Sequence, residues 1–373
     1  METTKTSIHI YFASLPDPRV IGRCDHSLLD ILSVALLAVL SGADDFSDME
    51  AFGLSRSDWL QTFLPLKNGI PSDDTFRRVF AALDPKKFEH CFQQWANSLL
   101  DSIEGKLIAI DGKTVRGSYT KRNGPIHLVH AWVQEHQLLL GQVATSEKSN
   151  EITAIPELLK LLDIKGATVT IDAMGCQKEI ANQIIAQGGN YILSLKDNHP
   201  TFCSEVEMYF KDMKEEEEMS KIETTDGEHG RIEIRKIYVT QEVAWYADHR
   251  QWKGLKSLIM IESERQLGEK ISRENRYYIS SLKEGASSLG GKIRGHWSVE
   301  NELHWGLDVS FGEDGSRVRE RNGAENLSLL RKMALMMLKR EKSSKRGVAG
   351  KRKKAGWDPS YLAKLLVDHL TLF

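Results

Sequence analysis

The chain has 373 residues, and its 50 Lys and Arg nearly balance its 52 Asp and Glu, which gives a formal net charge of -2. This balance excludes a globally basic coat protein for nucleic acid, although it leaves room for local basic patches. Hydrophobic residues at 41% and charged residues at 27% are typical of a globular protein that can build two or three domains.

The cysteines and the apolar runs indicate the cellular compartment in which we expect the protein. The four cysteines are far apart and include no Cys-x-x-Cys pair, which excludes a zinc ribbon and favours a reducing, cytoplasmic setting. The most apolar run, residues 31–43, has about 13 residues, whereas a helix that crosses a membrane needs roughly 20. The N-terminal residues lack the apolar core of a signal peptide, so we expect no membrane association.

Residues 1–104 predict an all-α N-terminal region. Leucines recur at helical spacing in HSLLDILSVALLAVL, and polar capping residues open PSDDTFRRVFAAL. Paired short helices can form a DNA-binding helix-turn-helix, which would expose Arg77 and Arg78. A helical bundle with a solvated charged face accounts equally well for the same pattern.

From residue 106 the pattern changes to an α/β arrangement. KLIAID, IHLVHAWVQ and LLLGQVAT predict three strands, and a helix, a strand, a helix and a strand follow. Helices that link strands imply parallel pairing, whereas the first strands form an antiparallel hairpin. The order β-β-β-α-β-α-β therefore predicts an RNase H-like core with a mixed five-stranded sheet.

Residues 199–287 interrupt this core. The acidic run KDMKEEEEM predicts a solvated helix or loop, and RIEIRKIYVT, SLIMIESER and NRYYISSL read as strands. We therefore expect a mostly β insertion that precedes a last helix over 288–307, all within a catalytic domain of residues 105–340. Residues 341–373 are rich in Lys and Arg and predict a flexible basic tail that contacts phosphates. A disordered tail that only increases solubility fits the same composition equally well.

Two of the predicted core strands end in an aspartate, Asp111 after LIAI and Asp172 after ATVTI. Catalytic groups of open α/β sheets gather at the carboxyl ends of strands, so adjacent strands can place these two side chains together. Carboxylates at short range raise each other's pKa unless a cation intervenes, which favours a divalent metal. Taken singly, each aspartate fits an ordinary turn or helix cap.

A third carboxylate lies in the 288–307 helix. One helical face carries Ile293, Trp297, Glu300, His304 and Leu307. Glu300 is therefore expected to face the core, where a carboxylate needs a cation or a metal, whereas Glu302 is expected to face solvent. His296 and His304 flank Glu300 by one turn, which leaves a zinc site open, but two oxygen-donating aspartates favour magnesium or manganese.

Two Asp and one Glu around two Mg²⁺ or Mn²⁺ ions suit the in-line displacement of a phosphodiester. Cations near these carboxylates are then candidate phosphate contacts. They are Lys113 and Arg116 after the first Asp, Lys178 after the second, and Lys196 after the strand NYILSL. Each of them, taken alone, is equally typical of an ordinary protein surface.

Several segments together resemble the H-repeat-associated proteins, which belong with the DDE transposases of a bacterial insertion-sequence family of the ISAs type. They are IDGKTVRGS, EKSNEITAIPELLKLLDIKGATVTIDAMGCQKEIA, YILSLKDN, HGRIEIR and RGHWSVENELHWGLDVSFGEDGSRVR. The resemblance covers about residues 10–365. It implies a metal-dependent transposase whose Asp-Asp-Glu triad is Asp111, Asp172 and Glu300. It also implies double-stranded DNA as the partner, both terminal inverted repeats and target, and a homo-oligomer in the synaptic complex.

The chain departs from that family around the Glu. Related transposases often place a Tyr, an Arg and a Lys where this sequence has Ile293, His296 and Leu307. The substitutes expected to contact DNA are Arg294 and His296, and Arg231 of HGRIEIR is a further candidate. Glu151 of SNEI also matches the family, but it has no predicted role beyond capping the next helix.

Two other functions fit the same residues. The protein could be an inactive or domesticated DNA-binding remnant of an element, or a metal-dependent DNA nuclease that does not join strands. A zinc-dependent hydrolase built on His296 and His304 is a third alternative.

Overall fold

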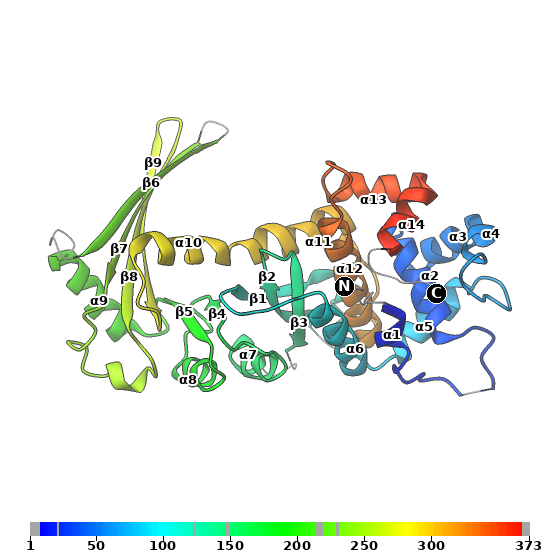
Figure 1. Ribbon diagram of the computed structural model, residues 1–373, viewed down its shortest axis with the longest axis horizontal. Helices are drawn as coiled ribbons and strands as arrows, with labels where there is room; N and C mark the ends of the chain where they lie inside the picture. The colour runs from blue at the N-terminus through cyan, green and yellow to red at the C-terminus, as the bar shows by residue number, and fades with distance from the viewer. Residues whose placement is uncertain are drawn as a thin grey trace.

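The computed structural model describes residues 8–20, 22–121, 124–145, 150–213, 219–228 and 231–367. The molecule is elongated, with a sheet in the middle, long strands that project at one end and a bundle of helices at the other (Figure 1). The acidic run KDMKEEEEM falls largely on residues 214–218, which lie outside the described residues.

The N-terminal region is all-α, as predicted. Its helices are α1 (Ile8–Phe12), α2 (Leu28–Leu40), α3 (Phe46–Ser55), α4 (Ser57–Leu60), α5 (Asp73–Ala82) and α6 (Pro85–Ser98). The side chains of Ser27, Asp45, Ser72 and Asp84 accept backbone N–H groups at the starts of α2, α3, α5 and α6. These caps satisfy donors that a helix start otherwise leaves unpaired, which is why the helices begin there.

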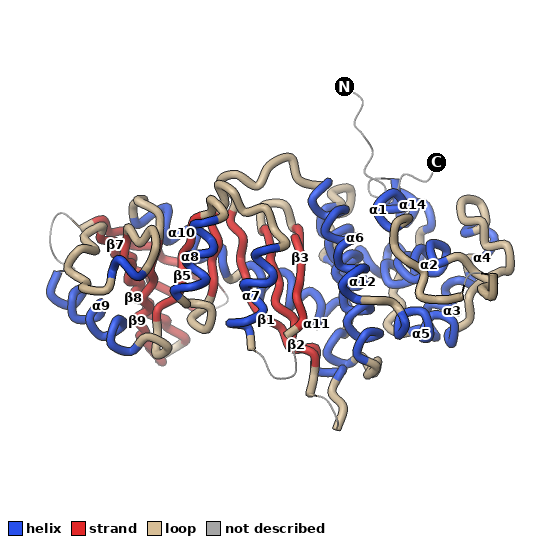
Figure 2. Tube along the Cα trace, turned by 90° about the horizontal axis from the view of Figure 1, so that it is seen from below, coloured by secondary structure: helices blue, strands red, loops and turns tan. Residues whose placement is uncertain are grey.

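The predicted RNase H-like core is confirmed. Its elements are β1 (Leu107–Val115), η1 (Arg116–Ser118), β2 (Ile126–Val133), β3 (Leu138–Ala144), α7 (Glu151–Lys160), β4 (Thr168–Ile171), α8 (Lys178–Ala186) and β5 (Asn190–Leu195). β1, β2 and β3 pair antiparallel, whereas β4 lies parallel to β1 and β5 parallel to β4. Helices α7 and α8 cover one face of this sheet (Figure 2).

The insertion extends the core sheet. It contains α9 (Pro200–Met213), β6 (Ser220–Glu228), β7 (Arg231–Thr240), η2 (His249–Gln251), β8 (Ser257–Leu267) and β9 (Lys270–Ser280). Because β9 pairs antiparallel with β5, the described residues form one nine-stranded sheet in the order β3-β2-β1-β4-β5-β9-β8-β7-β6. We call the strands β6–β9, which project from the core in Figure 1, the β-arm.

The helix predicted over 288–307 is not one continuous α-helix. It is α10 (Ala286–His296), a π-helical segment η3 (Val299–His304) and α11 (Trp305–Phe311), followed by η4 (Glu313–Gly315) and α12 (Arg321–Arg340). A π-helical turn contains an extra residue and therefore breaks a stripe that assumes 3.6 residues per turn. The core-facing prediction for Glu300 was wrong: Glu300 is exposed and Trp297 is 40% exposed, whereas His304 is buried.

The C-terminal part is helical too, with α13 (Val348–Trp357) and α14 (Pro359–Val367), so the flexible tail expected there was wrong over the described residues. Lys351 and Arg352 are buried. The Arg352 guanidinium donates to the backbone oxygens of Val39 and Ser310 at 2.9 and 2.8 Å and lies over the Phe311 ring. Arg352 thus holds α13 against α2 and α11, and Lys351 donates to Leu338 and Glu341 at the end of α12.

One apolar core joins the two ends of the chain. Helix α12 packs against α2, α5 and α6 on one side and against β3 on the other, so the N-terminal helices and the sheet share a continuous set of buried residues. Among the described residues, no helix combines the length and the apolar character needed to cross a membrane.

Candidate active site

Asp111 and Asp172 lie at the same level of adjacent parallel strands. Ile110 of β1 pairs with Ile171 of β4, and each aspartate is the next residue along its chain. The prediction that Asp111 ends its strand was wrong, because antiparallel pairing with β2 continues β1 to Val115. Because side chains alternate along a strand, both carboxylates leave the sheet on the face opposite to Ile110 and Ile171. Together with Glu300 they line a cleft of about 540 Å³, so the structure brings the three predicted carboxylates to one site.

The negative charge of the site is not fully balanced by positive charge around it. Burial raises the pKa of Asp111 to about 7, and the charges of Asp172, Glu151 and Glu300 act in the same direction, against a backbone hydrogen bond from Gly112. Burial also raises the pKa of Asp172, as does the charge of Glu151, although Oδ1 accepts the Met174 and Gly175 N–H groups. Such a cluster of oxygen donors favours a divalent cation.

This charge predicts a pH dependence for the metal-free protein. The pKa of the Asp111 carboxyl is about 7 in the folded protein, against an ordinary value of 3.8. Between these two pH values Asp111 is protonated in the folded state and ionised in the unfolded state. The free energy of unfolding therefore falls as the pH rises through this window. Asp111→Asn should remove this fall. Urea denaturation in EDTA at about pH 4 and about pH 8 measures it, and parallel pH curves for the two proteins would contradict it.

Glu151 lies beside this site, and the sequence did not predict this position for it. It opens α7, half-buried, and its Oε1 accepts a hydrogen bond of 2.6 Å from Nε2 of His127 on β2. The other ring nitrogen of His127 lies 2.9 Å from the Thr114 hydroxyl on β1. Gly112 marks this contact in the sequence: a Cβ there would lie 2.1 Å from Glu151 Oε1 and 2.4 Å from His127 Nε2, so a larger residue would have to displace these side chains.

Gly112→Ala is therefore expected to reduce activity strongly. The new methyl group would displace Glu151 and His127 or shift β1 beside Asp111, and a displacement of about 1 Å near reacting groups can cost roughly 100-fold in rate. The measurement is the rate of DNA cleavage at equal amounts of folded protein. Gly124→Ala is the matched control, because a Cβ at Gly124 meets nothing within 4 Å. Equal rates for the two variants would show that the close contact is unimportant.

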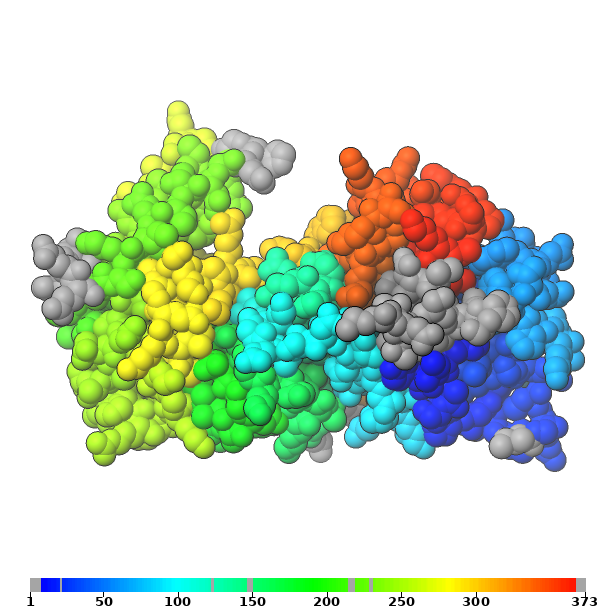
Figure 3. Space-filling view, in the orientation of Figure 1, coloured from blue at the N-terminus to red at the C-terminus, as the bar shows by residue number. Residues whose placement is uncertain are grey.

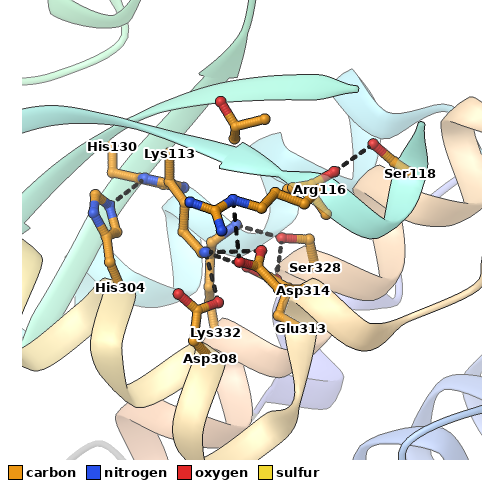
Figure 4. A network of polar contacts seen from close by, with 12 residues as sticks. Lys113, Arg116, Ser118, His130, His304, Asp308, Glu313, Asp314, Ser328 and Lys332 are labelled. Carbon is orange, nitrogen blue, oxygen red and sulfur yellow. Dashed lines mark hydrogen bonds and ion pairs between the residues drawn. The ribbon is translucent and has the colours of Figure 1, made fainter. Parts of the chain in front are cut away.

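Lys113 was predicted to contact phosphates, but its side chain lies in the interior of the protein (Figure 4). Its side chain is 7% exposed, and its Nζ lies 2.6 Å from Asp308 and 3.4 Å from Asp314. Lys113 follows Asp111 by two residues, so it leaves β1 on the same face, where α11 and η4 cover it. Arg116 remains at the surface, 79% exposed, with its Nε 3.5 Å from Asp314.

The other predicted DNA contacts lie in different surroundings. Lys196 is exposed and lines the cleft with the carboxylates. Arg294 is exposed and pairs with Asp226 at 2.8 Å. Lys178 and Arg231 are half-buried and contact Gln251 and Glu233, respectively.

The histidines near Glu300 are neutral. Burial lowers the pKa of His296 to about 4, and its Nδ1 lies 3.0 Å from the Thr170 hydroxyl. Burial lowers the pKa of His304 to about 3, and its Nε2 lies 3.1 Å from Nδ1 of the buried His130. His296 therefore has no positive charge to offer a phosphate at neutral pH.

Within the described ranges, no three His, Cys, Asp or Glu side chains are close enough together to hold a metal ion as they stand. His296 and His304 each contact another side chain, Thr170 and His130 respectively, and the zinc alternative stays a prediction. The carboxylates share a cleft without forming a closed shell, and the exposed Glu300 is the one whose side chain has room to turn. Glu302, expected at the surface, is half-buried and accepts hydrogen bonds from Gln134 and Gln137.

The sequence also did not predict a second groove, of about 990 Å³, which runs along the β-arm and α10. It meets the first cleft at Trp297 and Glu300, and the Arg276 guanidinium lies 5.3 Å from the centre of the Trp297 ring. A cationic and aromatic border next to the carboxylates is typical of surfaces that bind nucleic acid.

Comparisons with known proteins bear on this site. Residues 103–337 match the family model described as transposase DDE domain, and residues 9–96 match the model described as DDE_Tnp_1-associated. "Putative transposase YncI" of Escherichia coli O157:H7 is 43% identical over 96% of this chain and 94% of its own length. "H repeat-associated putative transposase YhhI" of Escherichia coli (strain K12) is 42% identical over 98% of both chains. "Inactive transposase YbfQ" of the same strain is 40% identical over 92% of its own length but only 21% of this chain.

Proposed function

This chain belongs to the DDE transposase family, and from that premise we propose that it cuts the ends of an insertion-sequence element and joins the freed 3'-hydroxyl groups to target DNA. The observation that carries the proposal is the meeting of Asp111, Asp172 and Glu300 in one cleft, with the pKa of Asp111 raised to about 7. A carboxylate in an ordinary turn or helix cap needs no other carboxylate beside it. This cluster brings several negative charges together, and a cation would neutralise them.

The donor set fits two Mg²⁺ or Mn²⁺ ions. Asp111, Asp172 and Glu300 would hold them, since these hard cations prefer carboxylate oxygens. When bound, such ions activate the attacking hydroxyl and stabilise the leaving oxygen of a phosphodiester displacement. The chain itself positions the carboxylates: strand pairing fixes Asp111 and Asp172, and the buried, neutral His304 keeps its ring 3.6 Å from Asp111 without adding a charge.

The DNA is proposed to lie along both grooves. Figure 3 shows a hollow between the β-arm and the C-terminal helices, above α10 and α11, and a duplex there would reach Glu300. Lys196, Arg276 and Arg294 border these grooves and would contact phosphates, which positions a duplex without reading its sequence. Recognition of terminal repeats is assigned to the N-terminal helices, where Arg77 and Arg78 are exposed, and synapsis of two ends to a homo-oligomer.

The test uses the purified full chain, Mg²⁺ or Mn²⁺, and labelled duplexes that carry the inverted repeats flanking the gene, together with a plasmid target. Strand cleavage followed by covalent joining to the plasmid is the expected result. Cleavage without joining would identify a nuclease, and specific binding without cleavage would identify an inactive remnant. Each of these two outcomes would overturn the proposal.

A further inference from the structure

Two residues of β1 meet two residues of the segment that carries Glu300. On β1, Asp111 and Lys113 share one face. On the opposing segment, His304 and Asp308 follow Glu300 by four and eight residues. His304 Nδ1 lies 3.6 Å from Asp111 Oδ2, and Asp308 Oδ1 lies 2.6 Å from Lys113 Nζ.

The two contacts are in register with one another. Alternate residues of a strand are separated by about 6.7 Å. Residues four apart on an α-helix are separated by about 6 Å along its axis. The strand step from Asp111 to Lys113 thus matches the helix step from His304 to Asp308. A slide of this segment by a single residue would separate both pairs, so the contacts specify one axial position of the helix on the strand.

Buried groups support the Lys113–Asp308 contact. Lys113 also lies 3.9 Å from Glu313, whose other carboxylate oxygen accepts a hydrogen bond of 2.7 Å from the Ser328 hydroxyl of α12 (Figure 4). Ser328 in turn contacts the fully buried Lys332, which donates to Gln142 of β3 at 2.7 Å. The polar contacts therefore run from β1 through η4 and α12 back to the same sheet, and they leave little room for α11 to move.

The π-helical segment explains why the position of Glu300 depends on these contacts. Glu300 and His304 both lie within η3, yet Glu300 is exposed in the cleft and His304 is buried against β1. A single α-helical register would not separate them in this way, because residues four apart lie on the same side. Asp308 lies on α11, directly C-terminal to this wider turn, and its contact with Lys113 ties that side of the turn to β1.

We propose that the Lys113–Asp308 and Asp111–His304 contacts form a register lock, which sets the position of the Glu300 carboxylate relative to Asp111. Lys113 and Asp308 are then positioning residues. They act through Glu300 and do not touch DNA. This inference rests on the proposed function, in which Asp111 and Glu300 hold the divalent ions.

The test compares Asp308→Asn with Asp314→Asn in the full chain. Both changes neutralise a carboxylate beside Lys113, but Asp314 lies in η4, beyond the helix that the lock positions. Mn²⁺ binding is measured by the electron paramagnetic resonance signal of the free ion, with cleavage of terminal-repeat DNA measured alongside. Asp308→Asn should weaken Mn²⁺ binding by about tenfold, as is usual when a residue that orients a metal ligand is lost, and Asp314→Asn by no more than about twofold.

Asp308→Glu separates positioning from folding. It keeps the charge beside Lys113, so it should restore most of the Mn²⁺ affinity that Asp308→Asn loses. Circular dichroism checks that each variant is folded at the temperature of the binding measurement. Equal Mn²⁺ affinity in Asp308→Asn and Asp314→Asn would overturn the register lock. The proposed function would fail differently, through a wild-type protein that binds no Mn²⁺ or an Asp111→Asn variant that still cleaves DNA.

Discussion

Asp111→Asn is expected to lower the rate of DNA cleavage and strand transfer by about 10³-fold or more, which corresponds to roughly 4 kcal/mol of transition-state stabilisation. The amide keeps the size of the side chain but removes the charge that holds a divalent cation. Asp172 cannot replace it, because this side chain is held by hydrogen bonds from Met174 and Gly175. Asp172→Asn should therefore have an effect of similar size.

Single-turnover cleavage of terminal-repeat DNA measures this effect, with the dissociation constant for the same DNA as the companion measurement. Asp101→Asn is the matched control, because Asp101 is exposed in the segment between α6 and β1. DNA binding should stay within about twofold in all three variants, since phosphate contacts with cations dominate affinity. Cleavage that persists in Asp111→Asn would remove this residue from the site, whatever the other carboxylates do.

Glu313→Gln is expected to lower the free energy of unfolding by about 3–5 kcal/mol, the usual cost of removing one partner from a buried set of charges. Glu313 is fully buried, and its charge is the largest influence that opposes the lowering of the pKa of Lys332, which burial brings to about 8. Burial also lowers the pKa of Arg331, and the charge of Glu313 is again the largest influence that opposes this lowering. Without Glu313, these cations and Lys113 stay in the interior with less opposite charge around them.

Urea denaturation followed by circular dichroism measures this loss. Asp314→Asn, the neighbouring residue, is the control. Its carboxylate also lies near Lys113 but is partly exposed, so its loss should cost no more than about 1 kcal/mol. Similar midpoints for the two variants would mean that the buried charge at Glu313 contributes little to stability.

The two aspartates of the site could be predicted because local sequence determines them. A run of apolar residues predicts a strand, and the residues that follow parallel-paired positions lie at one level of a sheet. The strand end predicted at Asp111 was wrong, because β1 continues to Val115, whereas Asp172 does follow the last residue of β4. The pairing of Ile110 with Ile171 then places Asp111 and Asp172 as expected. Glu300 lines the same cleft, although it is exposed and does not face the core as the sequence predicted.

The cations could not be predicted in the same way, because their partners are far away in the sequence. Lys113 meets Asp308, 195 residues later, and Arg352 meets Val39, 313 residues earlier. A basic residue that follows a strand, or one in a Lys-rich tail, looks exposed when only its neighbours in sequence are known. Burial turned both into internal partners of carboxylates and backbone oxygens.

The sequence by itself determined the order of strands and helices in the core, the mostly β character of the insertion and the places of Asp111 and Asp172 after apolar strand residues, because alternation, periodicity and capping act over a few residues. Three of the four insertion strands were predicted, and β6 was not. Tertiary structure alone decided which face of the last helical segment Glu300 occupies, how β9 joins β5 to extend the sheet, and which cations remain at the surface. These features depend on which distant segments pack together, and charged groups are either paired or exposed according to that packing.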